Sequence, residues 1–135
     1  MLGEMIGESR GKRVVRRVIP AEGIVPVRIE VSIEDSGKLL GIDTTGFGSY
    51  CATPRADGML LGEGQGVVTT RDGEMVTWKG SGLGKLSPGG AISYRGILYY
   101  QTASQKLARL NSAPAVFEYD IDPSGETHVK QWEWK

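Results

Sequence analysis

Residues 58–86 read GMLLGEGQGVVTTRDGEMVTWKGSGLGKL, and this stretch decides the fold. Glycine stands at every second position on both sides of a central Asp-Gly pair. A period of two is typical of one face of a β-strand, and Asp-Gly between alternating segments is typical of a hairpin turn because both residues tolerate positive φ. We therefore predict two antiparallel strands, each carrying a glycine row. The two glycine rows are Gly62, Gly64 and Gly66, and Gly80, Gly82 and Gly84.

The length of this turn decides which faces of the strands carry glycine. A two-residue turn at Asp72-Gly73 pairs Arg71 with Glu74 and puts the two glycine rows on opposite faces. One extra residue, as a bulge, puts both rows on one face, in line with Trp78. We favour the bulged hairpin.

The glycine rows need a physical reason, because glycine inside a strand costs about 0.5–1 kcal/mol relative to alanine. Sharp coiling of a small barrel, or room for aromatic rings from the facing wall, would supply that reason. A ligand resting on the glycines would supply it as well, and we prefer curvature as the commoner use. The segment GEGQG at residues 62–66 is not a phosphate-binding loop, because that motif precedes a helix and none is expected after Gly66.

Composition narrows the class of protein. The 135 residues suffice for one domain with a hydrophobic core, and 16 basic and 16 acidic residues cancel, so we expect neither a nucleic-acid nor a membrane partner. The single Cys51 forms no internal disulfide, and the first residues lack a secretion signal, so we expect a cytoplasmic protein. No apolar run approaches the roughly 20 residues of a membrane helix. Twenty glycines favour many short strands over a helical bundle.

The rest of the chain alternates strand patterns with turn residues. The clearest strand is Val27 to Glu34, where apolar and polar residues alternate as in a half-buried antiparallel strand. We expect turns at Asp35-Ser36-Gly37 and at Thr44-Thr45-Gly46, which would make Lys38 to Asp43 a short strand of its own. Further strands are expected at Val14–Ile19, Phe47–Thr53, Met59–Thr69, Glu74–Leu86, Ala91–Thr102, Ala113–Asp122 and Glu126–Lys135.

Only Ala103 to Leu110 has a helical pattern, with Ser104 as a cap, and we expect this short helix to cover a barrel mouth. The predicted fold is all-β: a single antiparallel up-and-down β-barrel of eight or nine strands with one short helix, spanning residues 1–135. Residues 1–12 are left open as a flexible arm. A barrel of about eight strands holds side chains or one small ligand.

The strand rhythm of residues 25–135 resembles the allene oxide cyclase-like (calycin-type) β-barrel superfamily. The resemblance rests on the glycine-row hairpin, on Tyr94-Arg95-Gly96 and on the glycine-rich turns. The segments from Tyr94 through Asn111 to Trp132-Glu133-Trp134-Lys135 are similar to bacterial members of unknown function. The resemblance implies a closed barrel with an apolar cavity, often oligomeric, and transfers no functional residue.

Few residues could carry chemistry. His128 is the only histidine and Cys51 the only thiol, which argues against clustered metal sites, and we expect no metal and no cofactor. A carboxylate inside a barrel would have a raised pKa and could act as an acid or base. The weak catalytic candidates are Glu63, Glu118, Tyr94 and Tyr99; Asp43 could also face an interior, and Glu118 shares a strand face with Asp120.

Aromatic side chains are the better lead to a site, because large rings with a polar tip suit pocket walls, subunit interfaces and cores alike. Arg95 could anchor an anionic group or pair with Glu118 on a neighbouring strand. The predicted ligand-binding residues are Trp78, Tyr94, Arg95, Tyr100 and Trp132.

Three functions stay open. The first is a non-catalytic barrel that binds an apolar or amphipathic small molecule in a cavity of at least a few hundred cubic ångströms. The second is a homo-oligomeric structural protein with a packed interior and an interface containing Trp132 or Trp134. The third is a cofactor-free isomerase or cyclase. We rank them in this order.

Overall fold

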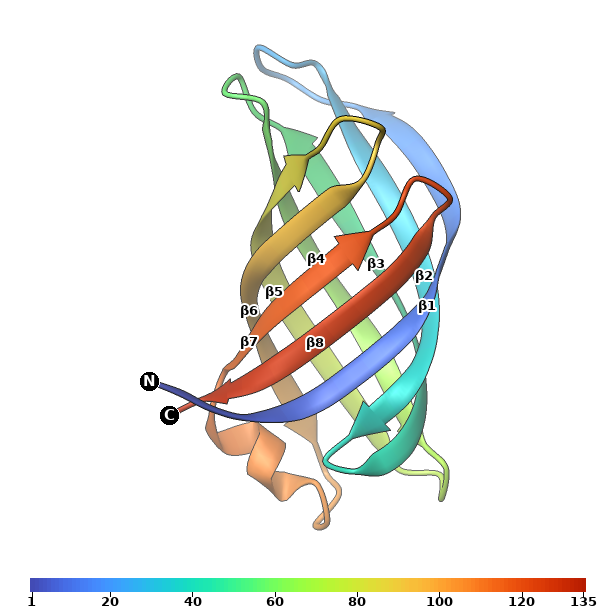
Figure 1. Cartoon of the computed structure of the whole chain (residues 1–135), viewed down its shortest axis with the longest axis vertical. Coiled ribbons are helices and arrows are strands. Elements are labelled where there is room, and N and C mark those ends of the chain that lie inside the picture. The colour runs from blue at the N-terminus through green and yellow to red at the C-terminus, as the bar shows by residue number, and fades with distance from the viewer.

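The computed structural model describes residues 1–135 and shows a closed barrel of eight antiparallel strands (Figure 1). Each strand pairs with the next strand along the chain, and β1 pairs with β8 to close the barrel. The predicted all-β up-and-down barrel is therefore confirmed. The strands are β1 (Leu2–Pro20), β2 (Val27–Leu39), β3 (Ile42–Pro54), β4 (Met59–Thr70), β5 (Met75–Leu86), β6 (Ile92–Thr102), β7 (Ala115–Ile121) and β8 (Glu126–Trp134).

The hairpin of β4 and β5 contains the extra turn residue that we favoured. The turn spans Arg71 to Gly73, with Gly73 at φ 89°, and the Thr70 amide donates to the Glu74 carbonyl at 2.8 Å. This register sets Gly64 opposite Gly80. Residues directly opposite one another share a face, so both glycine rows face the same way, into the barrel.

Two predicted turns are wrong. Asp35-Ser36-Gly37 lies inside β2 and Thr44-Thr45-Gly46 inside β3, and the chain reverses instead at Leu40 and Gly41, whose φ angles are 50° and 77°. Lys38 to Asp43 is therefore not a separate strand. Glycine stands within strand β2 here because the neighbouring strand β1 comes too close for a side chain. A Cβ on Gly37 would lie 2.0 Å from the Glu8 carbonyl oxygen.

Strand β1 is much longer than the predicted Val14–Ile19. Residues 2–12 belong to β1 and pair with β8, for example Gly7 with Gln131 and Lys12 with Glu126, so the structure places no separate arm there. The register of β1 against β2 shifts between Arg13 and Val15. The two chain ends lie side by side, and the N-terminal amino group donates to the Lys135 carbonyl at 3.0 Å (Figure 1).

The predicted helix at Ala103–Leu110 is wrong in length and type. The segment contains one 3-10 turn, η1 (Ala108–Ser112), and no side chain caps it. A run this short gains little from helix formation, whereas the three-residue spacing of Leu107 and Leu110 matches a 3-10 turn and points both side chains the same way. Both leucines are fully or almost fully buried and belong to the hydrophobic core, and the segment that carries them lies at the lower end of the barrel in Figure 1. No helix is long and apolar enough to span a membrane.

Candidate functional site

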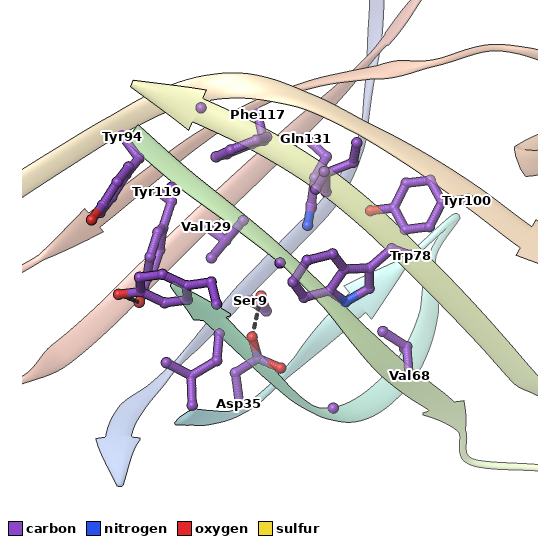
Figure 2. A pocket seen from close by; sticks show the side chains of 18 of the residues that line it. Ser9, Asp35, Val68, Trp78, Tyr94, Tyr100, Phe117, Tyr119, Val129 and Gln131 are labelled. Atoms are coloured by element: carbon purple, nitrogen blue, oxygen red, sulfur yellow. Dashed lines mark hydrogen bonds between the residues drawn. The ribbon is translucent and has the colours of Figure 1, made fainter. Parts of the chain in front are cut away.

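The barrel contains an internal pocket of about 100 Å³ that is partly open to solvent (Figure 2). All eight strands contribute to its lining. The pocket is smaller than the few hundred cubic ångströms expected from the sequence, because aromatic side chains fill much of the interior. These include Trp78, Tyr94, Tyr100, Phe117 and Tyr119.

The two glycine rows form one wall of this pocket. At the ends of the rows, aromatic rings lie directly on the glycines: a Cβ on Gly66 would be 2.4 Å from the Trp78 ring, and one on Gly84 would be 2.5 Å from the Tyr94 ring. The prediction that the rows make room for rings is therefore confirmed. Side chains also lie close to the glycines between these rings: a Cβ on Gly80 would be 2.4 Å from the Leu98 side chain, and one on Gly82 would be 2.9 Å from the Phe117 ring. The backbone of this stretch still lines the pocket. We call this part the glycine floor, and it consists of Gly62, Glu63, Gly64, Gly80, Ser81 and Gly82.

A tyrosine cluster stands at one end of the pocket. Tyr94 and Tyr119 stack with ring centroids 5.6 Å apart, and Tyr50 packs edge-on against both at 5.7 Å. The Tyr50 and Tyr119 hydroxyl groups share a hydrogen bond of 3.1 Å. Burial raises the pKa of all three phenols, so they are neutral hydrogen-bonding groups at physiological pH.

Two arginines share the inner face of β1 beyond this tyrosine cluster. Arg13 lies opposite Ile33 and Arg16 opposite Val31, both of which are core residues. Their positive charges oppose the rise in the pKa of Tyr50. Neither arginine forms an ion pair within the chain. Arg13 is half-buried and Arg16 is exposed, and the charges of both act on the Tyr50 phenol.

Asp35 places a carboxyl group inside the pocket. It lies on β2 two residues after the buried Ile33, and the Ser9 hydroxyl donates to its Oδ2 at 3.3 Å (Figure 2). Burial raises the pKa of Asp35, and the Ser9 hydrogen bond opposes that rise. The negative charge of Asp35 also raises the pKa of the buried Tyr100, after the larger effect of burial itself.

Several polar atoms that line the pocket have no hydrogen-bond partner in the protein. They are Asp35 Oδ1, the Tyr100 hydroxyl, the Gln131 amide and the Trp78 indole N–H. In Figure 2 the polar end of Gln131 and the hydroxyl of Tyr100 lie on the same side of the Trp78 indole. Asp35, Trp78 and Gln131 are half-buried, and the pocket opens to solvent, so these groups are accessible from the pocket. These atoms can therefore serve a bound molecule.

The structure brings three of the predicted ligand-binding residues together in the pocket. Trp78, Tyr94 and Tyr100 all line it. Arg95 is exposed on the outer surface instead, where it pairs with Asp120 at 3.1 Å and with Glu118 at 3.8 Å. It follows the buried Tyr94, and successive side chains of a strand point to opposite faces.

The same alternation puts Trp132 and most of the catalytic candidates outside. Trp132 lies between Gln131, which lines the pocket, and the buried Glu133, so its own side chain faces outward and pairs with Met5 of β1. Glu63 and Tyr99 are exposed, and Glu118 is engaged with Arg95. Of the four catalytic candidates, only Tyr94 faces the pocket. Asp43 also faces outward, toward Lys38 at 2.9 Å.

The sequence contained a signal for the residues that were missed. The alternation that makes Val31 and Ile33 inward-facing continues through Asp35, and only the turn assigned there hid it. Gln131 could be found in the same way from the alternation of β8. Tyr50 and Ser9 carried no such signal, because their strands have glycine or charged neighbours on both faces.

Asp35 should reduce stability at neutral pH, and Asp35→Asn should raise it. A carboxyl group with a raised pKa in the folded state favours folding when it is protonated, and this contribution is lost as pH rises from the ordinary value of 3.8 through the folded pKa. The melting temperature of Asp35→Asn should therefore exceed that of the parent protein at about pH 7, with the difference shrinking toward about pH 3. Thermal melts across this range test it, and a difference independent of pH would contradict it.

The fold and its pocket define a class of closed eight-stranded antiparallel barrels with a small internal cavity. No family model and no curated protein matches the sequence. A protein of unknown function from Clostridium acetobutylicum has a similar structure, with a TM-score of 0.85, 15% identity and coverage of 98% of this chain and 99% of that one. A conserved protein of unknown function from Rhodopseudomonas palustris is also similar in structure, with a TM-score of 0.82, 16% identity and coverage of 98% of this chain and 97% of that one.

A third similar structure is that of an enzyme from Penicillium herquei, with a TM-score of 0.67, 15% identity and coverage of 96% of this chain and 92% of that one. At these identities the likeness concerns the fold. The chain is thus similar to bacterial barrel proteins whose function is not known.

Proposed function

We propose that this protein binds a small, flat, mainly apolar molecule with at least one polar substituent inside the barrel. The observation that carries the proposal is the combination of a backbone floor with unpaired polar atoms around one pocket. Ligand pockets are typically apolar with a few polar groups that fix orientation, and this pocket has that composition.

The shape of the pocket favours a flat molecule. The glycine rows let flat rings pack closely against this wall of the pocket, with Trp78 on Gly66, Tyr94 on Gly62 and Phe117 on Gly82. An aromatic ring in the remaining space would lie among these rings. An engineered cavity of about 150 Å³ holds benzene, so a pocket of about 100 Å³ that opens to solvent suits one ring with the remainder of the molecule reaching outward.

The chemistry of the lining favours a neutral molecule with a hydrogen-bonding group. Asp35, Tyr100 and Gln131 offer donors and acceptors. The Asp35 carboxyl group disfavours an anion beside it, and the positive charges of Arg13 and Arg16 disfavour a cation beside the tyrosine cluster. A phenol, an enol or a conjugated ketone combines the flat ring and the polar group that the pocket calls for.

Three finer expectations from the sequence belong to this proposal and stay predictions. They are membership of the allene oxide cyclase-like superfamily, a cytoplasmic location and assembly into a homo-oligomer. Outward-facing apolar residues on neighbouring strands, Met5, Trp132, Val116 and Ile97, favour the last of these. Catalysis is compatible with the fold, since the neighbour from Penicillium herquei is an enzyme.

Binding can be tested by NMR titration with phenol and indole, with cyclohexanol as a non-planar control. We expect the indole N–H resonance of Trp78 to shift with the planar probes and not with cyclohexanol. Val129→Phe fills the pocket from the opposite wall and should weaken binding at least tenfold, which corresponds to about 1.4 kcal/mol. Val116→Phe, on the outer face, is the matched control. Equal affinity of both variants, or shifts confined to the outer face, would refute the pocket as the binding site.

A further inference from the structure

Asp35 is the one residue with a carboxylate side chain directed into the pocket. The other acidic residue in the lining, Glu63, contributes its backbone to the glycine floor, and its side chain is exposed on the outside. Asp35 has no cationic partner: it appears in no ion pair, and its single side-chain hydrogen bond comes from the neutral Ser9 hydroxyl. One of its oxygens remains unpaired. A purely structural buried carboxylate would normally be paired with a cation or several donors.

The groups around Asp35 are neutral on nearly every side. On β2 itself, Lys38 points outward to Asp43. Strands β4, β5 and β8 give the pocket no titratable side chain, and β3, β6 and β7 give only tyrosines. On β1, Gly11 lies opposite Asp35, and the inner-face residues on either side of Gly11 are Ser9 and Arg13. Arg13 forms no ion pair with Asp35, and Arg16 lies further along the strand. The tyrosines are Tyr50, Tyr94, Tyr100 and Tyr119.

This setting makes Asp35 a stronger base than a carboxylate in water. A partly buried carboxylate without a counter-charge gains from accepting a proton. Proton transfer is most efficient when the pKa of the catalytic group lies near the working pH. The pKa of an ordinary carboxyl group lies below neutral pH, so a raised pKa brings Asp35 closer to that condition. The donors of Tyr100 and Gln131 are available to stabilise negative charge that develops on a bound molecule.

We propose that Asp35 is a catalytic general base that moves a proton within a flat, conjugated substrate bound in the pocket. The Asp35 carboxylate takes a proton from a C–H bond beside a carbonyl group. The electron pair of that bond moves into the conjugated system, and the resulting oxyanion accepts a hydrogen bond from Tyr100 or Gln131. The protonated Asp35 then returns the proton to another atom of the same molecule. The reaction is an isomerisation, so it needs no oxidant or reductant.

This inference rests on the binding function proposed above and goes beyond it. Binding alone requires the floor and the donors, and it leaves the base strength of Asp35 unused. Catalysis requires in addition that Asp35 reach the bound molecule in its ionised form. The two can therefore fail separately.

Nitrobenzisoxazole is a suitable probe, because it is flat and aromatic and reports directly on a general base. A base removes its one acidic C–H proton, the N–O bond breaks, and the electron pair leaves on oxygen to give a coloured cyanophenolate. We expect the parent protein to accelerate this ring opening with saturation in probe concentration. The rate should rise with pH through the raised pKa of Asp35 and then level off.

Asp35→Asn should lower the rate at least about 100-fold, the range expected for loss of a general base. Glu34→Gln alters the preceding carboxylate, which is exposed on the outer face, and should leave the rate unchanged. Ser9→Ala removes the hydrogen bond that lowers the pKa of Asp35, so it should move the midpoint of the pH–rate profile to higher pH. This shift also tests the proposal if Asp35→Asn does not fold.

The outcomes separate the two proposals. Binding of the probe at the Trp78 resonance without turnover above that of Asp35→Asn would overturn catalysis and leave binding intact. Turnover that is insensitive to Asp35→Asn, or a pH midpoint unmoved by Ser9→Ala, would overturn the role of Asp35. If neither phenol, indole nor nitrobenzisoxazole binds, both proposals are wrong.

Discussion

Gly37→Ala is expected to lower the free energy of unfolding by about 3 kcal/mol, the upper part of the range for overpacking. Gly37 lies opposite Ser9 in the pairing of β1 with β2. An alanine Cβ would lie 2.0 Å from the Glu8 carbonyl oxygen and 2.6 Å from the Ser9 Cα. Both are backbone atoms, so the clash can be relieved only by moving a whole strand. Urea unfolding measured by circular dichroism gives the change.

Ser36→Ala is the matched control for Gly37→Ala. Ser36 is the preceding residue and is exposed on the outer face, so its replacement should change stability by no more than about 0.5 kcal/mol. Gly37→Ala should also weaken probe binding, because moving β1 displaces Ser9 from Asp35. If the two variants unfold at the same urea concentration, the close approach of β1 and β2 is not what requires glycine here.

Leu107→Ala is expected to cost about 3 kcal/mol, within the range for a deleted buried leucine. Leu107 has no exposed surface and packs into the lower end of the barrel. The segment that carries Leu107 cannot easily shift to fill the cavity left by the substitution, because hydrogen bonds hold it to β6 and β8. Asn111 accepts a hydrogen bond from the Thr102 amide at 2.8 Å and donates to the Thr102 carbonyl at 2.9 Å, and Arg109 donates to Glu133 at 2.9 Å.

Leu83→Ala is the control for this prediction, because Leu83 is 42% exposed on the outer face. It should cost less than about 0.5 kcal/mol. Thermal or urea unfolding of both variants measures the difference. A loss at Leu107 no larger than that at Leu83 would show that the 3-10 segment is not a structural part of the barrel.

The sequence predicted the barrel because its strongest signals are local and belong to the backbone. Alternating glycine around Asp72-Gly73 and alternating apolar residues in Val27 to Glu34 each specify a strand with one inward face. The wrong turn at Asp35-Ser36-Gly37 has a physical cause. The same residue types that form turns also permit close approach between strands, and only the pairing of β1 with β2, more than 20 positions apart in sequence, distinguishes the two uses.

The candidate site was predicted in part for a related reason. Trp78, Tyr94 and Tyr100 were found because the interior of a small barrel needs large side chains at inward positions. Arg95 and Trp132 were chosen for their chemistry although each follows an inward residue, so alternation put them outside. Asp35 was missed because Asp35-Ser36-Gly37 was assigned to a turn, although the inward alternation of β2 continues through Asp35.

The pairing of β1 with β8, which closes the barrel, has a consequence for the order of folding. Seven of the eight strand pairings join neighbours in the chain and can form as each hairpin is synthesised, whereas β1 must wait for β8. Until then the growing chain is an open sheet with two unpaired edges, and β1 is its longest strand, with 19 residues. Charged side chains such as Arg10, Lys12 and Arg17 lie on β1, and they oppose the pairing of this unpaired edge with another molecule. Closure of the barrel thus also ends the interval in which the nascent chain is most exposed to aggregation.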